Sequence, residues 1–274
     1  MNTCLIDKVR RFQELHAAPG VFLLPNPWDA GSARLLAALG FSALATSSVA
    51  CAGVLGRRDG RTTRAETLAH ARAIVAATEL PVSADLEKGF GDDPGTVAET
   101  IALAAAAGLA GGSIEDASGD SRQPLYPVSL AVERVAAAVQ AARALPVPFV
   151  LTARAENFLR GNPDLDDTIA RLQAYEKAGA DVLFAPGLPS LEAVRCVCAA
   201  VSKPVNFMAG LKGKSFTVAE LAAAGVRRIS LGPSLYRAAM GGLLGAASET
   251  LRHGTFGFLE KMPTAAELTQ FLEP

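Results

Sequence analysis

The sequence is poor in the residues on which several kinds of active site depend. It has three histidines, four cysteines and one tryptophan in 274 residues. His16 and His70 fall within helical patterns and His253 lies near the C-terminus, so no histidine is predicted to be catalytic. No Ser-His-Asp or Cys-His order can be built around them, which disfavours a covalent hydrolase. The cysteines form no CxxC pair, which argues against a disulfide framework.

The sequence also lacks an excess of charge of either sign. Its formal net charge is −1, and its isoelectric point is about 6.3. This balance provides no electrostatic footprint for the phosphate backbone, so no nucleic-acid partner is expected.

Long hydrophobic runs are absent as well. The apolar stretch Ile101–Gly112 is too short and too rich in alanine and glycine to span a bilayer. The N-terminal segment has no long apolar run and carries Asp7 and Glu14, which fits neither a secretory signal nor a transit peptide. The sequence therefore predicts a soluble protein with no membrane partner, and a cytoplasmic location is the default expectation.

Abundant apolar residues in a repeating pattern are present instead. Half of the residues are hydrophobic and only 19% are charged, which is enough apolar material for a large core. About eight short aliphatic or β-branched runs alternate with turns and alanine-rich amphipathic segments, as in a (β/α)8 TIM barrel of the α/β class. The predicted strands are Val21–Leu24, Ser42–Thr46, Val82–Asp85, Gly112–Glu115, Phe149–Ala153, Val182–Ala185, Pro204–Phe207 and Arg228–Leu231. The predicted helices include Ala30–Leu39, Arg64–Thr78, Gly95–Ala107, Val128–Arg143 and Leu165–Ala178.

The closed barrel is favoured over an open doubly wound sheet. The open sheet has the same alternation but normally carries a GxGxxG turn after its first strand, whereas here that strand runs into PNPWDAGSA. No low-complexity linker or abrupt charge shift divides the chain. Residues 1–274 are therefore predicted to form one barrel domain.

The C-terminal residues 253–274 extend past the eighth unit as a helical tail, with a last helix near Thr264–Leu272. Its apolar side chains need a surface to bury against; they are Phe256, Phe258, Leu268 and Phe271. We therefore expect the tail to lie at a subunit interface of a homo-oligomer.

Charged side chains gather where the predicted strands end, which is where barrel active sites lie. Asp85 and Glu87 follow one strand, Glu115 and Asp116 another, and Arg154 a third. Asp85 and Glu87 are two residues apart, so on a strand they would point the same way. Clustered carboxylates repel one another, and Mg²⁺ held by one or two of them, with waters and substrate oxygens, would neutralise them. Arg154 offers a planar fork for a substrate carboxylate.

These carboxylates also have a purely structural interpretation. They could cap the following helices or pair with arginines such as Arg154. Asp92 and Asp93 stand directly before Pro94, an arrangement typical of a helix start, and are left out of the predicted metal site.

Six motifs follow one another in register along the chain: NPWDAGSARLLAALGF, ATSSVACAGVLGRRDG, PVSADLEKGFGDD, GGSIEDA, LTARAENFL and RLQAYEKAGADVLFAPG. In this order they resemble the barrel-strand motifs of the isocitrate lyase/phosphoenolpyruvate mutase superfamily, and the likeness covers nearly the whole chain.

The resemblance implies roles for individual residues around the substrate. Ser47 and Ser48 match the loop that receives the substrate carboxylate. Asp59 matches a polar residue over the site, taken as catalytic together with Arg154. Arg154 also matches the substrate-binding arginine, and Asn206 resembles a polar substrate-binding position on the seventh strand.

The resemblance likewise implies a Mg²⁺ site made of three carboxylates. Asp85 matches the central contact to the metal. Glu87 stands where many relatives have aspartate, and Glu115 matches a further acidic residue of the metal shell that acts largely through water.

The loop after the fourth strand departs from the pattern of the superfamily. The lyases that split isocitrate or methylisocitrate carry a Lys-Lys/Arg-Cys-Gly-His loop whose cysteine protonates the departing carbanion. Here the stretch reads EDASGDSRQPLYP, without Cys, Lys or His, and Cys51 belongs to a different loop. The Lys and Asn that phosphonate mutases and hydrolases use in this loop are absent too. Whether residues 117–127 close over the site as a lid is left open.

What remains intact is the machinery that binds a carboxylate and stabilises an enolate through Mg²⁺. The sequence therefore predicts a carbon–carbon lyase or decarboxylase for a small 2-oxo or 2-hydroxy carboxylic acid, either oxaloacetate-like or substituted-malate-like. Two alternatives stay open: action on a phosphonopyruvate-type P–C bond, and a catalytically silent barrel used for binding. Since relatives exchange a C-terminal helix between subunits, the resemblance also implies a dimer or tetramer.

Overall fold

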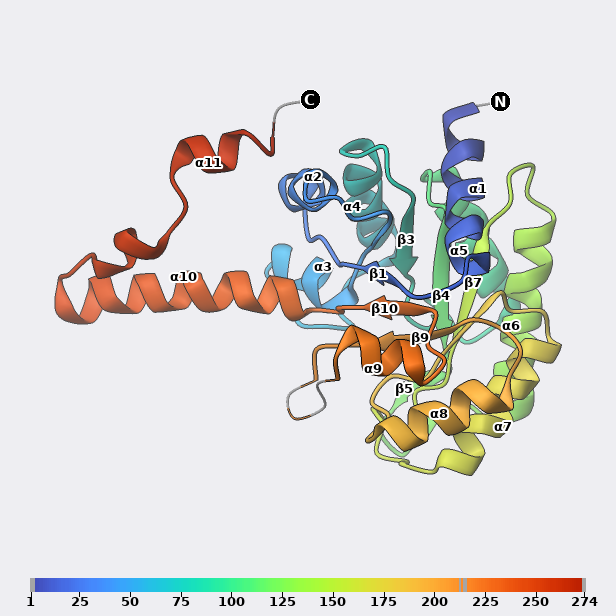
Figure 1. Ribbon diagram of the computed structural model, residues 1–274. Helices are drawn as coiled ribbons and strands as arrows, with labels where there is room; N and C mark the ends of the chain where they lie inside the picture. The colour runs from blue at the N-terminus through green and yellow to red at the C-terminus, as the bar shows by residue number, and fades with distance from the viewer. Residues whose placement is uncertain (1–2, 212, 214–215, 273–274) are drawn as a thin grey trace.

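Eight parallel strands stand side by side in the computed structural model, which describes residues 3–211, 213 and 216–272 (Figure 1). They follow the order β1-β10-β9-β8-β7-β4-β3-β2. The two end strands are joined by a hydrogen bond of 3.0 Å from the Ala45 amide to the Pro25 carbonyl, so the sheet curls into a nearly closed barrel. The strands are β1 (Phe22–Leu24), β2 (Leu44–Ala45), β3 (Val82–Asp85), β4 (Gly111–Glu115), β7 (Val150–Arg154), β8 (Val182–Phe184), β9 (Val205–Met208) and β10 (Arg228–Ser230). The predicted (β/α)8 barrel is confirmed.

Helices surround the barrel, and their first residues explain where several of them begin. Thr63 and Glu66 form a reciprocal capping box at the start of α4, and Asp93 caps α5 with Pro94 in its first turn, as the Asp-Pro pair predicted. The helices that follow the strands are α2 (Ala30–Ala38), α3 (Ser48–Val54), α4 (Arg64–Ala76), α5 (Pro94–Ala106), α6 (Val128–Arg143), α7 (Leu165–Lys177), α8 (Leu191–Ala200) and α9 (Val218–Ala223).

The N-terminal helix α1 (Thr3–Ala17) packs across the N-terminal end of the barrel. Val9 and Phe12 of this helix are fully buried and belong to one apolar cluster with Val150 and Val182 at the start of β7 and β8. That end of the barrel is therefore filled by side chains, which leaves the C-terminal ends of the strands as the open end.

The loop after the fourth strand is an antiparallel hairpin of β5 (Ala117–Asp120) and β6 (Gln123–Leu125). Lys88 ties it to the β3 side of the barrel, since its Nζ lies 2.7 Å from the Ser118 carbonyl. The stretch 117–127, for which lid closure was left open, thus contains regular structure with a specific anchor.

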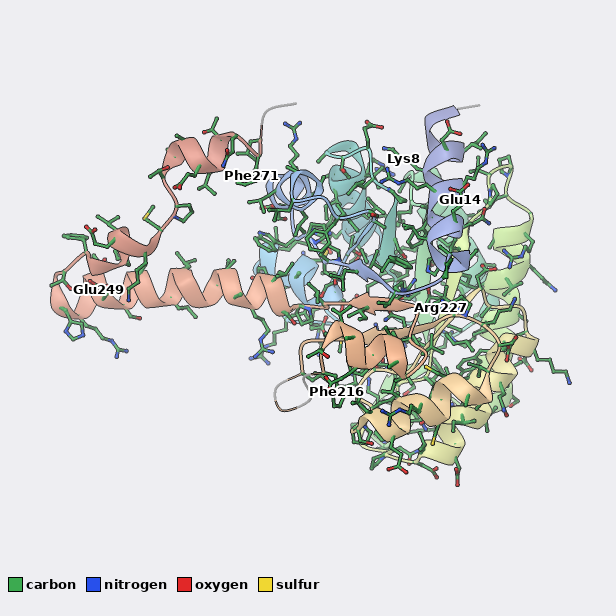
Figure 2. All side chains as sticks on the ribbon, in the orientation of Figure 1. Lys8, Glu14, Phe216, Arg227, Glu249 and Phe271 are labelled. Atoms are coloured by element: carbon green, nitrogen blue, oxygen red, sulfur yellow. The ribbon has the colours of Figure 1, made fainter. Side chains whose placement is uncertain are left out.

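The helix after the eighth barrel strand, α10 (Ser234–His253), contacts the barrel in its first turn through Leu235 and Tyr236 and then projects away from it (Figure 1). None of its residues is buried, and a 3-10 helix (Gly257–Lys261) and α11 (Ala265–Thr269) continue the arm. The arm exposes large apolar side chains (Figure 2), namely Leu243, Leu244, Leu251, Phe256, Leu259, Met262, Leu268 and Leu272. The predicted tail begins at residue 253, where α10 ends, and the structure adds that α10 itself also projects outward. The last helix is shorter than predicted, and the tail residues 273–274 lie outside the described part.

Within the described residues, no helix is both long enough and apolar enough to cross a membrane.

Candidate active site

A cavity of about 650 Å³ lies at the C-terminal ends of the barrel strands. The eight residues predicted from the sequence to form the site all line it; they are Ser47, Ser48, Asp59, Asp85, Glu87, Glu115, Arg154 and Asn206. The barrel thus brings together residues separated by up to 159 positions in the chain (206 − 47).

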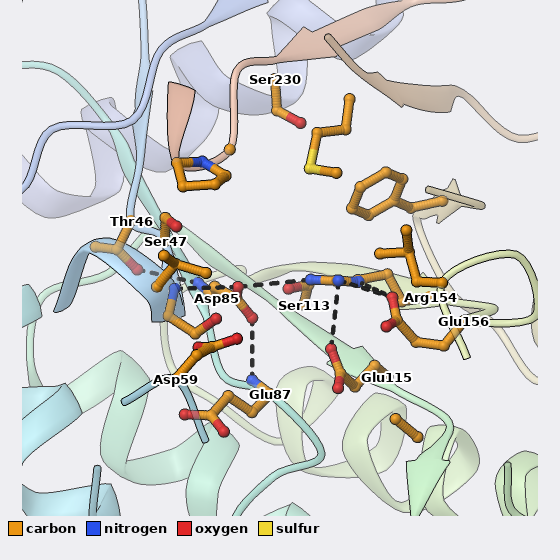
Figure 3. Close-up of a pocket in the computed structure, with 18 of the residues that line it drawn as sticks. Thr46, Ser47, Asp59, Asp85, Glu87, Ser113, Glu115, Arg154, Glu156 and Ser230 are labelled. Carbon is orange, nitrogen blue, oxygen red and sulfur yellow. Dashed lines mark hydrogen bonds and ion pairs between the residues drawn. The ribbon is translucent and has the colours of Figure 1, made fainter. Parts of the chain in front are cut away.

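Asp85, the last residue of β3, stands at the centre of the polar wall of this cavity (Figure 3). Its Oδ2 accepts a hydrogen bond of 3.2 Å from the Ser48 amide at the start of α3 and lies 3.5 Å from Arg154 Nη1. Its Oδ1 accepts from the Glu87 amide at 3.1 Å. The Asp85 carboxylate therefore joins three separate segments of the chain at one point.

Glu87 also reaches the cavity, but not by the strand alternation that the sequence suggested. The strand ends at Asp85, and Glu87 takes a left-handed backbone conformation with φ of 51°. Its carboxylate accepts a hydrogen bond of 3.2 Å from the Thr62 hydroxyl. A left-handed conformation is uncommon for a residue with a side chain and must be held by its surroundings. Glu87 lines the cavity, but the strand alternation on which its direction was predicted does not extend beyond Asp85.

Arg134 on α6 supplies part of that support. It is 1% exposed, and its Nη1 donates to the carbonyls of Gly91 and Asp92 at 2.7 and 2.6 Å, while its Nη2 donates to the carbonyl of Lys88. The guanidinium also lies over the ring of Tyr126 at 4.3 Å. By binding three backbone carbonyls, the buried Arg134 guanidinium stabilises the conformation of the loop after Glu87.

Arg154 lies at the centre of a network of ion pairs. Its Nη2 lies 2.7 Å from Glu156 and 3.5 Å from Glu115, and Arg160 pairs with the same two glutamates at 3.1 Å each. Because these carboxylates surround it, the pKa of the buried Arg154 is raised even though burial itself lowers it. The structural interpretation of the carboxylates is thus correct for Arg154, which pairs with Asp85, Glu115 and Glu156.

Glu156 and Arg160 were missed by the sequence analysis. Glu156 has a fully buried side chain and Arg160 a half-exposed one. Glu156 stands in the motif LTARAENFL, two residues after Arg154, and Arg160 directly follows that motif, so an extra carboxylate beyond the strand end was visible there. The sequence alone did not distinguish this carboxylate from the helix caps and surface charges that follow most strands.

Negative charge is in excess around Arg154. Two guanidinium groups, of Arg154 and Arg160, face four carboxylates, which belong to Asp85, Glu87, Glu115 and Glu156. Burial, with repulsion from Asp85, raises the pKa of Glu87 to about 7. Burial likewise raises the pKa of Glu115, with repulsion from Glu156 and Asp85 acting in the same direction. A hard divalent cation bound through oxygen atoms would offset this excess, so the donor set fits Mg²⁺.

The carboxylates do not form a closed cage of protein ligands. Within residues 3–211, 213 and 216–272, no three Asp, Glu, His or Cys side chains are grouped closely enough to hold a metal ion by themselves. A Mg²⁺ ion here would depend on one or two carboxylates, with waters and substrate oxygens completing its shell, which is its usual mode of binding.

The other predicted residues border the same cavity. Ser47 is 4% exposed and is the N-cap residue of α3, yet its side chain makes no capping hydrogen bond, so its hydroxyl is not committed to the helix. Asp59 lies in an exposed loop. Asn206 is 2% exposed on β9, where its amide nitrogen donates to the Ser230 hydroxyl at 3.0 Å.

Asp116 follows Glu115 but does not serve the cavity. Its carboxylate is buried on the helix side of the sheet, where it accepts hydrogen bonds from the Glu156 amide, from Arg171 at 3.1 Å and from the Tyr175 hydroxyl at 2.6 Å. Glu115 is the last residue of β4 and Asp116 directly follows it, and the two side chains face opposite sides of the sheet. The sequence prediction that grouped Asp116 with the strand-end chemistry was wrong.

The chain is a (β/α)8 barrel with a cavity at its C-terminal end, and charged residues from β3, β4 and β7 line that cavity. These features place it among the barrel proteins that have a polar site for a small molecule. The family model of phosphoenolpyruvate phosphomutase matches residues 12–251. The chain belongs to this family, within the PEP mutase/isocitrate lyase superfamily.

Individual relatives agree with this membership. The chain is 31% identical to the probable 2-methylisocitrate lyase 1 of Corynebacterium glutamicum over 281 residues, which cover 97% of this chain and 90% of the relative. A crystal structure of a candidate lyase/mutase from Burkholderia cenocepacia J2315 is 54% identical with a TM-score of 0.97, over 99% of this chain and 98% of that one. The crystal structure of 2,3-dimethylmalate lyase is 28% identical with a TM-score of 0.85, over 99% and 95% of the two chains.

Proposed function

We propose that this protein is a Mg²⁺-dependent carbon–carbon lyase or decarboxylase that acts on a small 2-oxo or 2-hydroxy carboxylic acid. The observation that carries the proposal is the cluster of excess carboxylates around Arg154, beside the uncommitted hydroxyl of Ser47. With Mg²⁺ offsetting the carboxylates, such a site would suit an anionic substrate whose reaction develops further negative charge. Two of the relatives are named as lyases, one of 2-methylisocitrate and one of 2,3-dimethylmalate, which favours the same reaction class.

The chain's own residues bind and orient the substrate in this proposal. Ser47 and Ser48 receive the substrate carboxylate at the start of α3, and Arg154 presents its Nη1 edge, which makes only a long contact of 3.5 Å to Asp85. Glu156 fixes the guanidinium plane through contacts of 2.9 and 2.7 Å to Nε and Nη2. Arg154 is therefore preorganised to stabilise charge that develops on the substrate.

Asp85 would hold Mg²⁺, with Glu87 and Glu115 acting through its water shell. When bound, the cation would supply positive charge to stabilise an enolate oxygen. Asp59, in its exposed loop, would complete the polar rim over the substrate.

The hairpin β5–β6 explains why the isocitrate-type reaction is not proposed. Gly119, Asp120 and Ser121 line the cavity from the hairpin, and none of them resembles the cysteine that the lyases of isocitrate use as an acid. A reaction that needs only a stabilised enolate, such as decarboxylation of an oxaloacetate-like acid or cleavage of a substituted malate, matches these residues better.

The proposal is tested by assaying the purified protein with oxaloacetate, 2,3-dimethylmalate and phosphonopyruvate, each with Mg²⁺ and with EDTA. We expect Mg²⁺-dependent turnover of at least one of the first two. Turnover of phosphonopyruvate alone would replace the proposal with P–C bond chemistry. Absence of turnover together with absence of Mg²⁺ binding at millimolar concentration would support the silent-barrel alternative.

We also propose that the protein is a homo-oligomer, a dimer or tetramer in which the arm from Ser234 onward covers a second subunit. The arm exposes eight large apolar side chains, and its end touches its own barrel through one hydrogen bond of 3.1 Å from Arg34 to the Leu272 carbonyl. Removal of the residues after His253 should lower the molar mass measured by light scattering. An unchanged mass would show that this part of the arm does not hold the oligomer together.

A further inference from the structure

A second arginine, Arg228, lies inside the barrel beneath the substrate cavity. It is the first residue of β10, is 4% exposed and borders the cavity. Its Nη2 donates to the Thr152 hydroxyl at 3.1 Å. Thr152 belongs to β7, the third strand from β10 in the sheet order, and precedes Arg154 by two residues. The Arg228 side chain therefore crosses the barrel interior one layer below Arg154.

All the side chains that bind Arg228 are neutral. Its Nε donates to Asn206 Oδ1 at 2.8 Å, and its Nη1 contacts His16 Nε2 at 3.2 Å. His16 Nδ1 faces the Phe12 carbonyl at 2.7 Å, so one neutral tautomer, with the proton on Nδ1, satisfies both contacts. Burial lowers the pKa of His16 to about 3, which keeps the imidazole uncharged.

The charge of Arg228 is consequently not balanced by the protein. No carboxylate of the described residues forms an ion pair with it, in contrast to Arg154 and its three acidic partners. Burial lowers the pKa of Arg228 to about 9, so the guanidinium is still charged at neutral pH. A buried cation without a counter-charge destabilises a fold. Its position at a ligand cavity therefore points to a role in binding.

Arg228 also fixes which way the Asn206 amide points. A guanidinium can only donate, so it must face the amide oxygen, and the amide nitrogen then lies on the other side, where it donates to Ser230. Asn206 and Ser230 both border the cavity. Of the two hydrogens on this nitrogen, the described residues provide an acceptor for one.

We propose that Arg228 is the residue that makes the cavity selective for dicarboxylic acids: its buried charge and the amide that it orients bind the second carboxylate of the substrate. This rests on the proposed function, in which Ser47 and Arg154 take the first carboxylate. The missing counter-charge of Arg228 is then the ligand itself. A monocarboxylic acid leaves Arg228 unbalanced and binds more weakly.

The test compares malate with lactate, which differ by one carboxylate, in calorimetric binding to the full-length protein with Mg²⁺. We expect wild type to bind malate about 10- to 100-fold more tightly than lactate. Arg228→Gln, which removes the charge but keeps a hydrogen-bonding group, should reduce this preference to less than about threefold. Arg228→Lys, which keeps the charge, should retain most of it.

The neighbouring residue provides a matched control. Arg227 is exposed, donates to the Gly20 carbonyl and does not line the cavity, so Arg227→Gln should leave the preference unchanged. A malate preference that survives in Arg228→Gln would overturn the proposal. So would a wild type that binds both acids equally, and in that case turnover of oxaloacetate could still uphold the proposed lyase.

A second variant keeps the test decisive if Arg228→Gln does not fold. Asn206→Asp places a carboxylate at the position that now lies 2.8 Å from Arg228 Nε. An internal counter-charge should raise the melting temperature and abolish the malate preference. A lower melting temperature with the preference intact would contradict the idea that Arg228 lacks a counter-charge.

Discussion

Replacing Asp85 with alanine is expected to reduce turnover by on the order of 10²–10³-fold or more while the barrel stays folded. Asp85 lies at a strand end, where its carboxylate joins the Ser48 amide, the Glu87 amide and Arg154. Its loss removes the central protein contact for Mg²⁺ and one of the groups that hold Arg154. Excess Mg²⁺ should restore activity only in part, because Glu87 and Glu115 remain at the periphery of the metal.

The stability of this variant should be close to that of wild type because two effects oppose each other. Hydrogen bonds to two amides are lost, but repulsion of Glu87 and Glu115 is relieved, since Asp85 contributes to the raised pKa of both. A carboxyl group whose folded pKa is raised stabilises the fold below its unfolded pKa, and this stabilisation is lost as pH rises through the folded value. In EDTA, wild type should therefore lose stability as pH rises from about 4.5 past 7, and Asp85→Ala should lose less.

The measurement is steady-state turnover across a Mg²⁺ titration, with circular dichroism melting of the same samples at two pH values. Glu99→Ala is a suitable control, since Glu99 is an exposed carboxylate paired with Arg64 away from the cavity. Near-normal turnover of Asp85→Ala, or wild-type activity that survives exhaustive EDTA treatment, would exclude the metal-enolate mechanism.

Arg154→Met is expected to abolish activity and, unlike the aspartate variant, to destabilise the fold by about 3–5 kcal/mol. The guanidinium is 11% exposed and is the shared partner of Asp85, Glu115 and Glu156. Its removal leaves three carboxylates in a buried region, where Arg160 still pairs with two of them, Glu115 and Glu156. Breaking one side of a buried ion pair costs more than losing the pair as a whole.

The matched control is Arg143→Met, in which an arginine of an exposed ion pair with Asp181 is replaced in the same way. That change should cost less than about 1 kcal/mol. Denaturant titration of both variants measures the difference. If Arg154→Met unfolds at the same denaturant concentration as Arg143→Met, the carboxylate network does not contribute to the stability of the fold.

Several features follow from local sequence alone. The alternation of aliphatic runs and amphipathic segments predicted all eight barrel strands to within two residues at either end, and Val82–Asp85 and Val128–Arg143 have the predicted bounds. The Asp-Pro pair before α5 likewise predicted the start of that helix. These signals are short-range: a strand or a helix start depends on residues within a few positions of one another.

The position of the candidate site could also be predicted, because parallel strands place their C-terminal ends at one edge and the charged residues follow those ends. The same logic did not predict the backbone of Glu87, which is left-handed and begins a loop that Arg134 of α6, distant in the chain, helps to hold. It also named Asp116 among the charged residues at the strand ends, although that carboxylate faces Arg171 and Tyr175.

Two features are determined by the tertiary structure alone: the direction of α10 and the partners of Arg228. The eighth helix carries an ordinary amphipathic pattern, and only the packed barrel shows that it projects outward from Ser234 with its apolar side chains exposed. The partners of Arg228 come from α1, β7 and β9, up to 212 positions away in the chain. The sequence by itself determined the barrel and the end at which its site lies, because both depend on local periodicity. Which charges are balanced and which are not was decided by contacts between distant strands, and no local pattern encodes those contacts.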